Sequence, residues 1–272
     1  MKFLSKVIFL VSAFIITINA DASFSKNYYN LHISKQKKYF INFFKKEIEI
    51  ENRNILEERA FIESLNKNKH LDPKSKEYKE LQELQIKYKI QTIYDYSRYL
   101  ERIDIIPPSL ALAQAAVESG WGKSRFFKEA NNIFGHWTYN PKIGMLPLRR
   151  QSDKKHFIRI FPDLQTSISA YMRNLNRTAA YYEFRLKRKE MRISGEYIDG
   201  MKLSSTMSKY SGIGHDYIKI LQSIIRKNHL TNFDKEFYNK LKKEKEKEKE
   251  KKELIPKKEE NEIYRAIKNL FY

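Results

Sequence analysis

The chain has 272 residues, of which 41% are hydrophobic and 14% aromatic, and it contains no cysteine. This length and apolar content exclude a fully disordered chain and suffice for one or two domains with a core. The lack of cysteine excludes disulfides and thiol chemistry. The formal net charge is +20, most of it in residues 23–230, so we expect an anionic partner such as nucleic acid, membrane surface or acidic polymer.

Residues 1–22 have the pattern of a secretory signal. Two lysines precede an apolar run over residues 7–18, and a small-residue segment over 20–22 offers a cleavage point. The alternative is an uncleaved membrane anchor, which needs about 20 apolar residues, more than this run offers. We therefore expect export to the periplasm or cell envelope. The anionic polymers there are cell wall and lipid headgroups, so we expect no nucleic-acid partner.

Apolar residues at helical spacing predict a long helix over 35–69 and another that begins near Ser75. A short helix over 92–103 is expected to stop before Pro107, because residues that precede proline avoid helical backbone angles. The next helix is predicted to start with Ser109 as its N-cap. Gly120 is its predicted end.

The periodicity changes after this region. Two short β-like runs within residues 145–161, separated by a polar turn, predict a hairpin. Helices are expected again over 167–191 and 215–228. Residues 231–272 are expected to be a charged, Lys/Glu-rich tail. From residue 240 they show no apolar periodicity until the last residues, which predicts a mobile tail or a solvated helix outside the domain.

Residues 110–124, LALAQAAVESGWGKS, place a single acid, Glu118, in the last turn of a nearly all-apolar helix. The helix dipole and desolvation beside Trp121 both raise the pKa expected for Glu118. A carboxylic acid that stays protonated near neutral pH can act as a general acid toward a glycosidic oxygen. Gly120 and Gly122 permit a sharp turn around Trp121. The alternative is a solvated surface glutamate.

The segment AQAAVESGWGKSRF, followed by NNIFGHW, resembles the signature of the bacterial glucosaminidases, the peptidoglycan hydrolases of glycoside hydrolase family 73. The segments IPPSLALAQAAVESGWG, LPLRR, AYMRNLN, YYEFR and YSGIGHDYIKIL resemble the Bax-type proteins of that family, and the resemblance covers about residues 35–230. It implies a mainly α (α+β), lysozyme-like fold with a small β-hairpin lobe. The implied activity is hydrolysis of the β-1,4 bond after N-acetylglucosamine in peptidoglycan glycan strands.

The resemblance also suggests how the chain is divided. We expect a signal peptide over 1–22, then an N-terminal helical region over 23–104 that packs on the catalytic domain. The glucosaminidase domain is expected over 105–230 and the charged tail over 231–272. We expect a monomer, with peripheral contact to an anionic membrane surface as a further possibility raised by the charge.

The resemblance implies that Glu118 is the general acid and that Tyr210 lines the cleft and helps to order the site. Aromatic rings stack on the apolar faces of sugars, so Trp121, Phe134 and Trp137 are candidates for substrate contact, with core packing as the alternative for each. Three further residues are expected to contact the substrate: Asn132, Gly135 and His156.

A second carboxylate is harder to find. Bax-type members carry a Glu after the hairpin His, whereas here His156 is followed by Phe157. The nearest acid is Asp153, which is a candidate base, although a solvated turn residue is the alternative. A two-carboxylate mechanism needs such a group at a fixed separation from the acid. Otherwise the N-acetyl oxygen of the substrate can attack the anomeric carbon.

No cofactor or metal is expected, because His136, His156 and His215 follow no metal-binding spacing. Two alternatives to a hydrolase remain at this point. A lytic transglycosylase also uses one Glu, but closes an anhydro ring on muramic acid. A non-catalytic wall-binding or scaffolding protein could have kept the fold.

Overall fold

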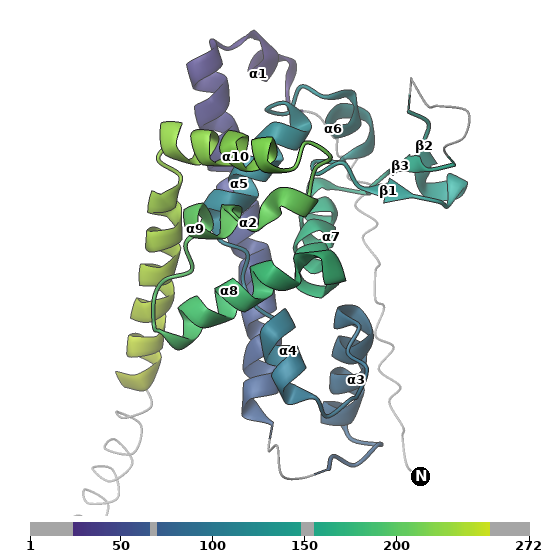
Figure 1. Ribbon diagram of the computed structural model, residues 1–272, viewed down its shortest axis with the longest axis vertical. Coiled ribbons are helices and arrows are strands. Elements are labelled where there is room, and N and C mark those ends of the chain that lie inside the picture. The colour runs from purple at the N-terminus through teal and green to yellow at the C-terminus, as the bar shows by residue number, and fades with distance from the viewer. Residues whose placement is uncertain (1–23, 66–69, 148–154, 251–272) are drawn as a thin grey trace, which may run out of the picture.

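The computed structural model describes residues 24–65, 70–147 and 155–250. Helices surround a central pair, and a small sheet projects from one side of the helical body (Figure 1). The elements are α1 Lys26–Asn30, α2 Ile33–Ser64, α3 Lys76–Tyr88, α4 Tyr96–Arg102, α5 Pro108–Ser119, α6 Arg125–Ala130, β1 Trp137–Thr138, η1 Pro141–Ile143, β2 Gly144–Met145, β3 Phe157–Arg159, α7 Leu164–Arg177, η2 Ala179–Tyr181, α8 Tyr182–Ile193, α9 Gly200–Ser204, η3 Met207–Lys209 and α10 His215–Lys227.

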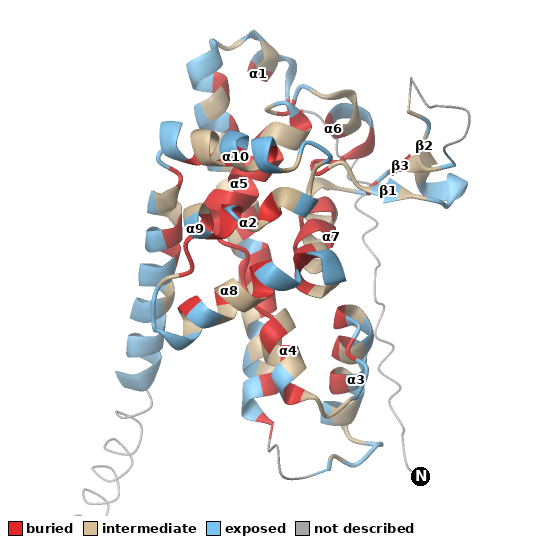
Figure 2. Cartoon of the chain, viewed as in Figure 1, coloured by how far each residue is buried: buried red, intermediate tan, exposed pale blue. Residues whose placement is uncertain are grey.

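The core forms around α2 and α5. Along α2 the buried apolar residues Phe40, Phe44, Ile48 and Ile55 recur at helical spacing, which confirms the long helix predicted from that spacing. α5 is buried over most of its length and lies at the centre of the molecule (Figure 2). Each fully buried large apolar side chain contributes about 1.5–3 kcal/mol to folding, so this pair holds the body together.

The start of α5 differs from the prediction. Pro107 is the N-cap and Pro108 occupies the first helical position, where its fixed φ favours the helix. Ser109 is therefore inside the first turn, and its N–H is satisfied instead by Asp234, 125 residues away along the chain. The predicted end is confirmed, because Gly120 caps the helix with a left-handed φ of 57°.

The small sheet has the strand order β1-β3-β2, with both pairs antiparallel. The β2–β3 pair is the predicted hairpin, and its register sets Met145 opposite Ile158. β1 was not predicted, because its two residues, Trp137 and Thr138, are too few to show an alternating pattern. The expected fold class, a mainly helical domain with a small β lobe, is confirmed.

Residues 231–250 form a helix that runs beside α2, in place of the expected segment outside the domain. The helix is one of the two expected forms, but its docking was not predicted: Phe233, Phe237 and Leu241 recur every four residues just before the Lys/Glu repeats and form an apolar seam. Phe237 is only 1% exposed. Among the described residues, the ion pairs between this helix and α2 are Lys45–Glu236, Glu49–Lys240 and Arg53–Glu244.

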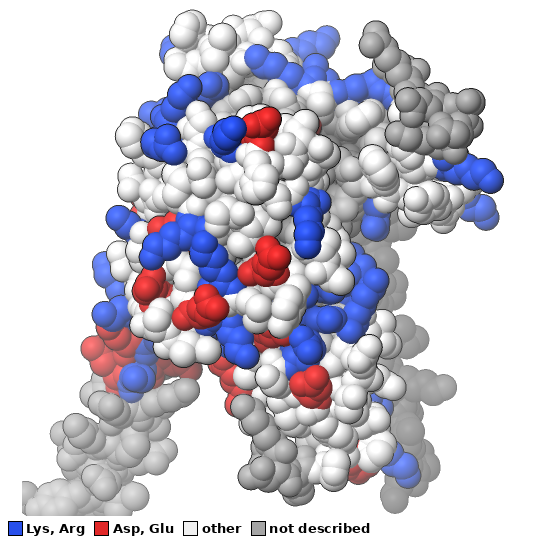
Figure 3. Space-filling model, in the orientation of Figure 1, with Lys and Arg blue, Asp and Glu red and all other residues white. Residues whose placement is uncertain are grey.

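Lys and Arg side chains are spread over the face of the molecule in view, in keeping with the net charge (Figure 3). Within residues 24–65, 70–147 and 155–250, no helix combines the length and apolar content needed to cross a membrane.

Candidate active site

Glu118 lies in the last turn of α5, where its carboxyl group is partly buried. The hydroxyl of Tyr217, in the first turn of α10, donates a hydrogen bond to Glu118 Oε1 at 2.7 Å. Burial raises the pKa of Glu118 above its ordinary value, and the hydrogen bond from Tyr217 opposes part of that rise. The carboxyl therefore stays protonated at higher pH than that of an exposed glutamate.

A chain of hydrogen bonds orients this contact. The Tyr171 hydroxyl donates to Gln114 Oε1 at 2.6 Å, and Gln114 Nε2 donates to the Tyr217 hydroxyl at 3.3 Å. Because that hydroxyl accepts from Gln114, its own proton is free to point at Glu118. Burial and the nearby Glu118 raise the pKa of Tyr217 well above its ordinary value, so Tyr217 remains a donor at physiological pH.

Aromatic rings surround the carboxyl group. Phe134 stacks on Tyr171, with ring centroids 3.8 Å apart, and Tyr210 lies parallel to Tyr217 at 5.6 Å. The Tyr210 hydroxyl donates a long hydrogen bond, 3.4 Å, to the carbonyl oxygen of Phe134. Burial raises the pKa of Tyr171, Tyr181 and Tyr210, and the nearby Glu118 adds to the rise for each. These rings give Glu118 the apolar surroundings that keep it protonated.

Gly135 leaves space beside the acid. Its φ of +69° favours glycine, and a Cβ built there would lie 3.7 Å from Glu118 Oε2. Any side chain at this position would therefore begin in contact with the Glu118 carboxyl group. The structure thus brings together four of the residues predicted from the sequence: Glu118, Phe134, Gly135 and Tyr210.

The turn after α5 is tightly held. Gly120, Trp121 and Gly122 all have positive φ, and for Trp121 this conformation costs roughly 1–2 kcal/mol. The Tyr28 hydroxyl stabilises the turn by donating to the Trp121 carbonyl at 2.7 Å. The Trp121 ring packs edge-on against Phe40 of α2, with centroids 5.4 Å apart. It lies in the packing between α2 and this turn.

Three other predicted residues make their contacts within or next to the β lobe. Asn132 is buried, and its side chain bonds to the backbone of His136 and Arg159, so it joins β3 to the loop before β1. Trp137 is 61% exposed and stacks on His156 with centroids 4.0 Å apart, within the β lobe. Asp153 lies outside the described residues.

No second acid stands beside Glu118 in the described part of the β lobe. Asp153 is the only acidic residue between positions 130 and 162 of the sequence. The described residues also contain no group of three or more His, Cys, Asp or Glu side chains that could hold a metal ion.

Tyr217, Gln114 and Tyr171 were not predicted from the sequence as site residues. Gln114 precedes Glu118 by one helical turn, so it shares a face with the acid, and this spacing was a usable signal. Tyr217 heads the buried stripe that continues with Leu221 and Ile225 on α10. Its partner Glu118 lies 99 residues away in the sequence, so no local pattern predicts the contact.

Residues 93–230 match the family model for glucosaminidases, which carries the description mannosyl-glycoprotein endo-beta-N-acetylglucosaminidase. The chain belongs to the glucosaminidase family. The matched residues include all of α5 and α10, and therefore Glu118 and its partner Tyr217. α1, α2 and the helix over 231–250 lie outside the matched part of this glucosaminidase.

Two similar proteins are informative. The glucosaminidase is 31% identical over 133 residues to Protein bax of Escherichia coli (strain K12), an overlap that covers 49% of this chain and 47% of that protein. The chain thus matches about half the length of this curated relative. A structure of the catalytic domain of the autolysin Auto from Listeria monocytogenes matches 73% of this chain and 87% of its own, with 18% identity and a TM-score of 0.41.

Proposed function

We propose that this glucosaminidase hydrolyses peptidoglycan, as an endo-β-N-acetylglucosaminidase that cleaves the β-1,4 bond after N-acetylglucosamine. The observation that carries the proposal is the Glu118 carboxyl group, which is held by Tyr217 among aromatic rings that raise its pKa by burial. The membership of the family supports the bond type, and the basic surface suits the acidic wall.

In the proposed mechanism, Glu118 gives its proton to the glycosidic oxygen as the bond to the anomeric carbon breaks. Tyr217 holds the carboxyl in one orientation throughout, and Gly135 leaves room for the sugar beside Oε2. The N-acetyl oxygen of the substrate attacks the anomeric carbon as the glycosidic bond breaks, since the described part of the lobe supplies no acid. Water then opens the resulting oxazolinium ion and gives a proton to the Glu118 carboxylate, which restores the acid. Tyr210, whose hydroxyl bonds to the carbonyl oxygen of Phe134, helps to order the site and to hold that N-acetyl group.

The test is product analysis. Purified peptidoglycan is digested with the full chain, and mass spectrometry identifies the new chain ends, which we expect to be reducing N-acetylglucosamine. Glu118→Gln should cleave roughly 10²- to 10⁴-fold more slowly while still binding sacculi. Release of peptides alone would contradict the proposal. Binding without cleavage by both wild type and variant would favour a wall-binding protein.

The same assay decides how the anomeric carbon is attacked. If the substrate supplies the nucleophile, Asp153→Asn should keep close to the wild-type rate. A loss comparable to that of Glu118→Gln would instead make Asp153 the second catalytic carboxylate.

A lytic transglycosylase is the second candidate, favoured by one observation, the lack of an acid in the described residues of the β lobe. Such an enzyme needs no protein base to activate water, because a hydroxyl of muramic acid attacks within the same sugar. Anhydro-muramic ends in the digest would establish this reaction in place of hydrolysis.

We also propose that residues 1–22, which lie outside the described part of the chain, direct export. The support is the charged, apolar and small-residue order of that segment, together with a substrate that lies outside the inner membrane. N-terminal sequencing of the protein recovered from the cell envelope should start at Ser23. Recovery of the intact chain from the cytoplasm would contradict export.

A further inference from the structure

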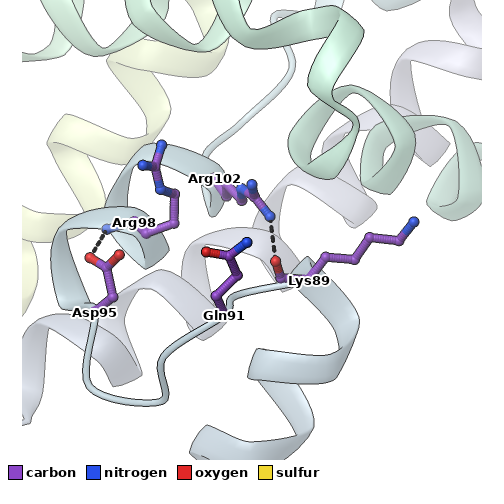
Figure 4. Close-up of a pocket in the computed structure, with 5 residues that line it drawn as sticks. All are labelled: Lys89, Gln91, Asp95, Arg98 and Arg102. Carbon is purple, nitrogen blue, oxygen red and sulfur yellow. Dashed lines mark hydrogen bonds between the residues drawn. The ribbon is translucent and has the colours of Figure 1, made fainter.

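A polar pocket lies far from Glu118 along the chain, where α3 ends and α4 begins. It has a volume of about 250 Å³, and its lining residues, Lys89, Gln91, Asp95, Arg98 and Arg102, are all polar or charged (Figure 4). Lys89 caps the end of α3, and Arg98 and Arg102 lie one turn apart on α4. In Figure 4 the amide of Gln91 lies below the two guanidinium groups, while the Lys89 side chain points away from them.

Positive charge is in excess around this pocket. Asp95 already accepts the backbone N–H of Arg98 as the N-cap of α4. Arg98 pairs with Glu101 Oε2 at 2.6 Å, but Glu101 also accepts from the buried Arg185 at 3.1 Å and is thus shared by two arginines. Arg102 pairs with no carboxylate among the described residues.

The Arg102 guanidinium is only partly bonded. Its Nη1 donates to the carbonyl oxygens of Tyr88 and Lys89 at 2.6 and 2.7 Å, which fixes the plane of the group. Its Nε is buried without a hydrogen-bond partner among the described residues. Burial and then the neighbouring charge of Arg185 lower the pKa of Arg102, while Glu101 and Asp95 oppose part of that effect. A buried N–H without a partner costs roughly 1–3 kcal/mol.

We propose that this pocket binds a small oxyanion, a carboxylate or a phosphate, through Arg102 and Arg98. Arg102 Nη2, which has no protein partner among the described residues, and the Arg98 guanidinium supply charged N–H donors, which suit the oxygens of either group. The volume suits a ligand of few atoms, since pockets for drug-sized molecules begin at about 300 Å³. This binding is independent of glycan cleavage and needs no part of the proposed catalytic site.

The Arg102 Nε–H resonance in a ¹H–¹⁵N spectrum of the full chain tests the proposal, and its absence in Arg102→Gln assigns the peak. Inorganic phosphate and a short glutamate-containing peptide are titrated separately against sodium chloride at matched ionic strength. We expect a saturable shift with one or both anions, and which of them acts identifies the source of the oxyanion.

Two variants show whether the response belongs to this pocket. Arg98→Gln should weaken the apparent affinity about tenfold, the usual effect of losing one charge-assisted bond. Arg226→Gln removes an exposed arginine of α10, outside the pocket, and should leave the affinity unchanged. The proposal is overturned if the wild type shows no saturable shift, or if Arg98→Gln binds as tightly as the wild type.

Discussion

At the scale of single residues, Glu118 combines two properties that oppose each other. Burial among aromatic rings keeps its proton bound, as a general acid requires, yet the same burial makes the ionised form costly. A group whose pKa is higher in the folded protein than in the unfolded chain adds stability at low pH. That stability is lost as the pH rises through the folded value. Glu118 should therefore reduce the stability of the protein at alkaline pH.

Replacing Glu118 with Gln should increase stability where the acid would be ionised. Gln keeps the shape and can still accept from Tyr217, but it carries no charge to bury. We expect a free energy of unfolding about 0.5–2 kcal/mol higher than that of the wild type at pH 8, and a smaller difference at pH 4. Urea unfolding at both pH values measures this. Glu190→Gln, at an exposed position, is the control and should change neither value. A variant less stable than the wild type at pH 8 would contradict the argument.

Tyr217→Phe should change the pH dependence of cleavage as well as its rate. The hydrogen bond from Tyr217 lowers the pKa of Glu118, so its removal raises that pKa further. The rate should fall roughly 10- to 100-fold because the carboxyl loses its fixed orientation. The alkaline limb of the pH–rate profile should move to higher pH. Tyr210→Phe, whose hydroxyl bonds to a backbone carbonyl, should leave that limb in place. Equal displacement in both variants would show that Tyr217 acts only through packing.

At the scale of secondary structure elements, local patterns predicted most of the helices. The amphipathic spacing in α2 and the serine before α3 are local signals, and Ser75 does cap α3 by accepting from Tyr78. The site was less predictable because its contacts join distant segments. Glu118 was found from its own helix, whereas Tyr217 depends on how α10 docks against α5. The seam of the C-terminal helix has only three apolar positions, Phe233, Phe237 and Leu241, and it directly precedes the Lys/Glu repeats.

Asp234 shows how an element is fixed from a distance. Buried in the C-terminal helix, it accepts from Ser109 N–H and Oγ–H at the start of α5, and from Gly200 N–H at the start of α9. Burial raises its pKa to about 7, although these hydrogen bonds act in the opposite direction. Between about pH 4 and pH 7 the folded protein binds this proton and the unfolded chain does not. Stability from this group therefore falls as the pH rises through that range.

Asp234→Asn shows whether burial or the hydrogen bonds control the pKa of Asp234, because Asn cannot ionise. The stability advantage of wild type over the variant should be larger at pH 5 than at pH 8, by about 1.4 kcal/mol for each pH unit between pH 5 and the folded pKa of about 7. Urea unfolding at the two pH values measures it, with Asp216→Asn at an exposed position of α10 as the control. An advantage that grows with pH would mean that the three donors outweigh burial.

At the scale of the whole molecule, segments outside the matched family region support the residues inside it. Asn52 of α2 exchanges two hydrogen bonds with the backbone of Ile106, just before α5. Tyr28 of α1 bonds the turn after α5, and Asp234 bonds its start. α5 is thus fixed at both ends by parts of the chain that lie outside residues 93–230. These contacts make residues 93–230 alone a poor candidate for an independently stable domain.

Two kinds of contact join the C-terminal helix, residues 231–250, to α2: the ion pairs and the apolar seam. All three pairs join residues 191 apart in sequence, so the two helices run parallel in one register. Exposed pairs of this kind contribute only about 0–1 kcal/mol each and weaken in salt. Phe237 is buried, and truncating such a residue to alanine costs about 3–5 kcal/mol.

We therefore expect Phe237→Ala to lower the free energy of unfolding by several times more than Glu244→Gln, which breaks the bidentate contact with Arg53. Urea unfolding of both variants in low salt and in about 1 M sodium chloride, where exposed charges are largely screened, separates the explanations. The effect of Phe237→Ala should persist in high salt, and the smaller effect of Glu244→Gln should vanish. If Glu244→Gln costs as much as Phe237→Ala in low salt, the ion pairs, and not the seam, hold the helix to α2.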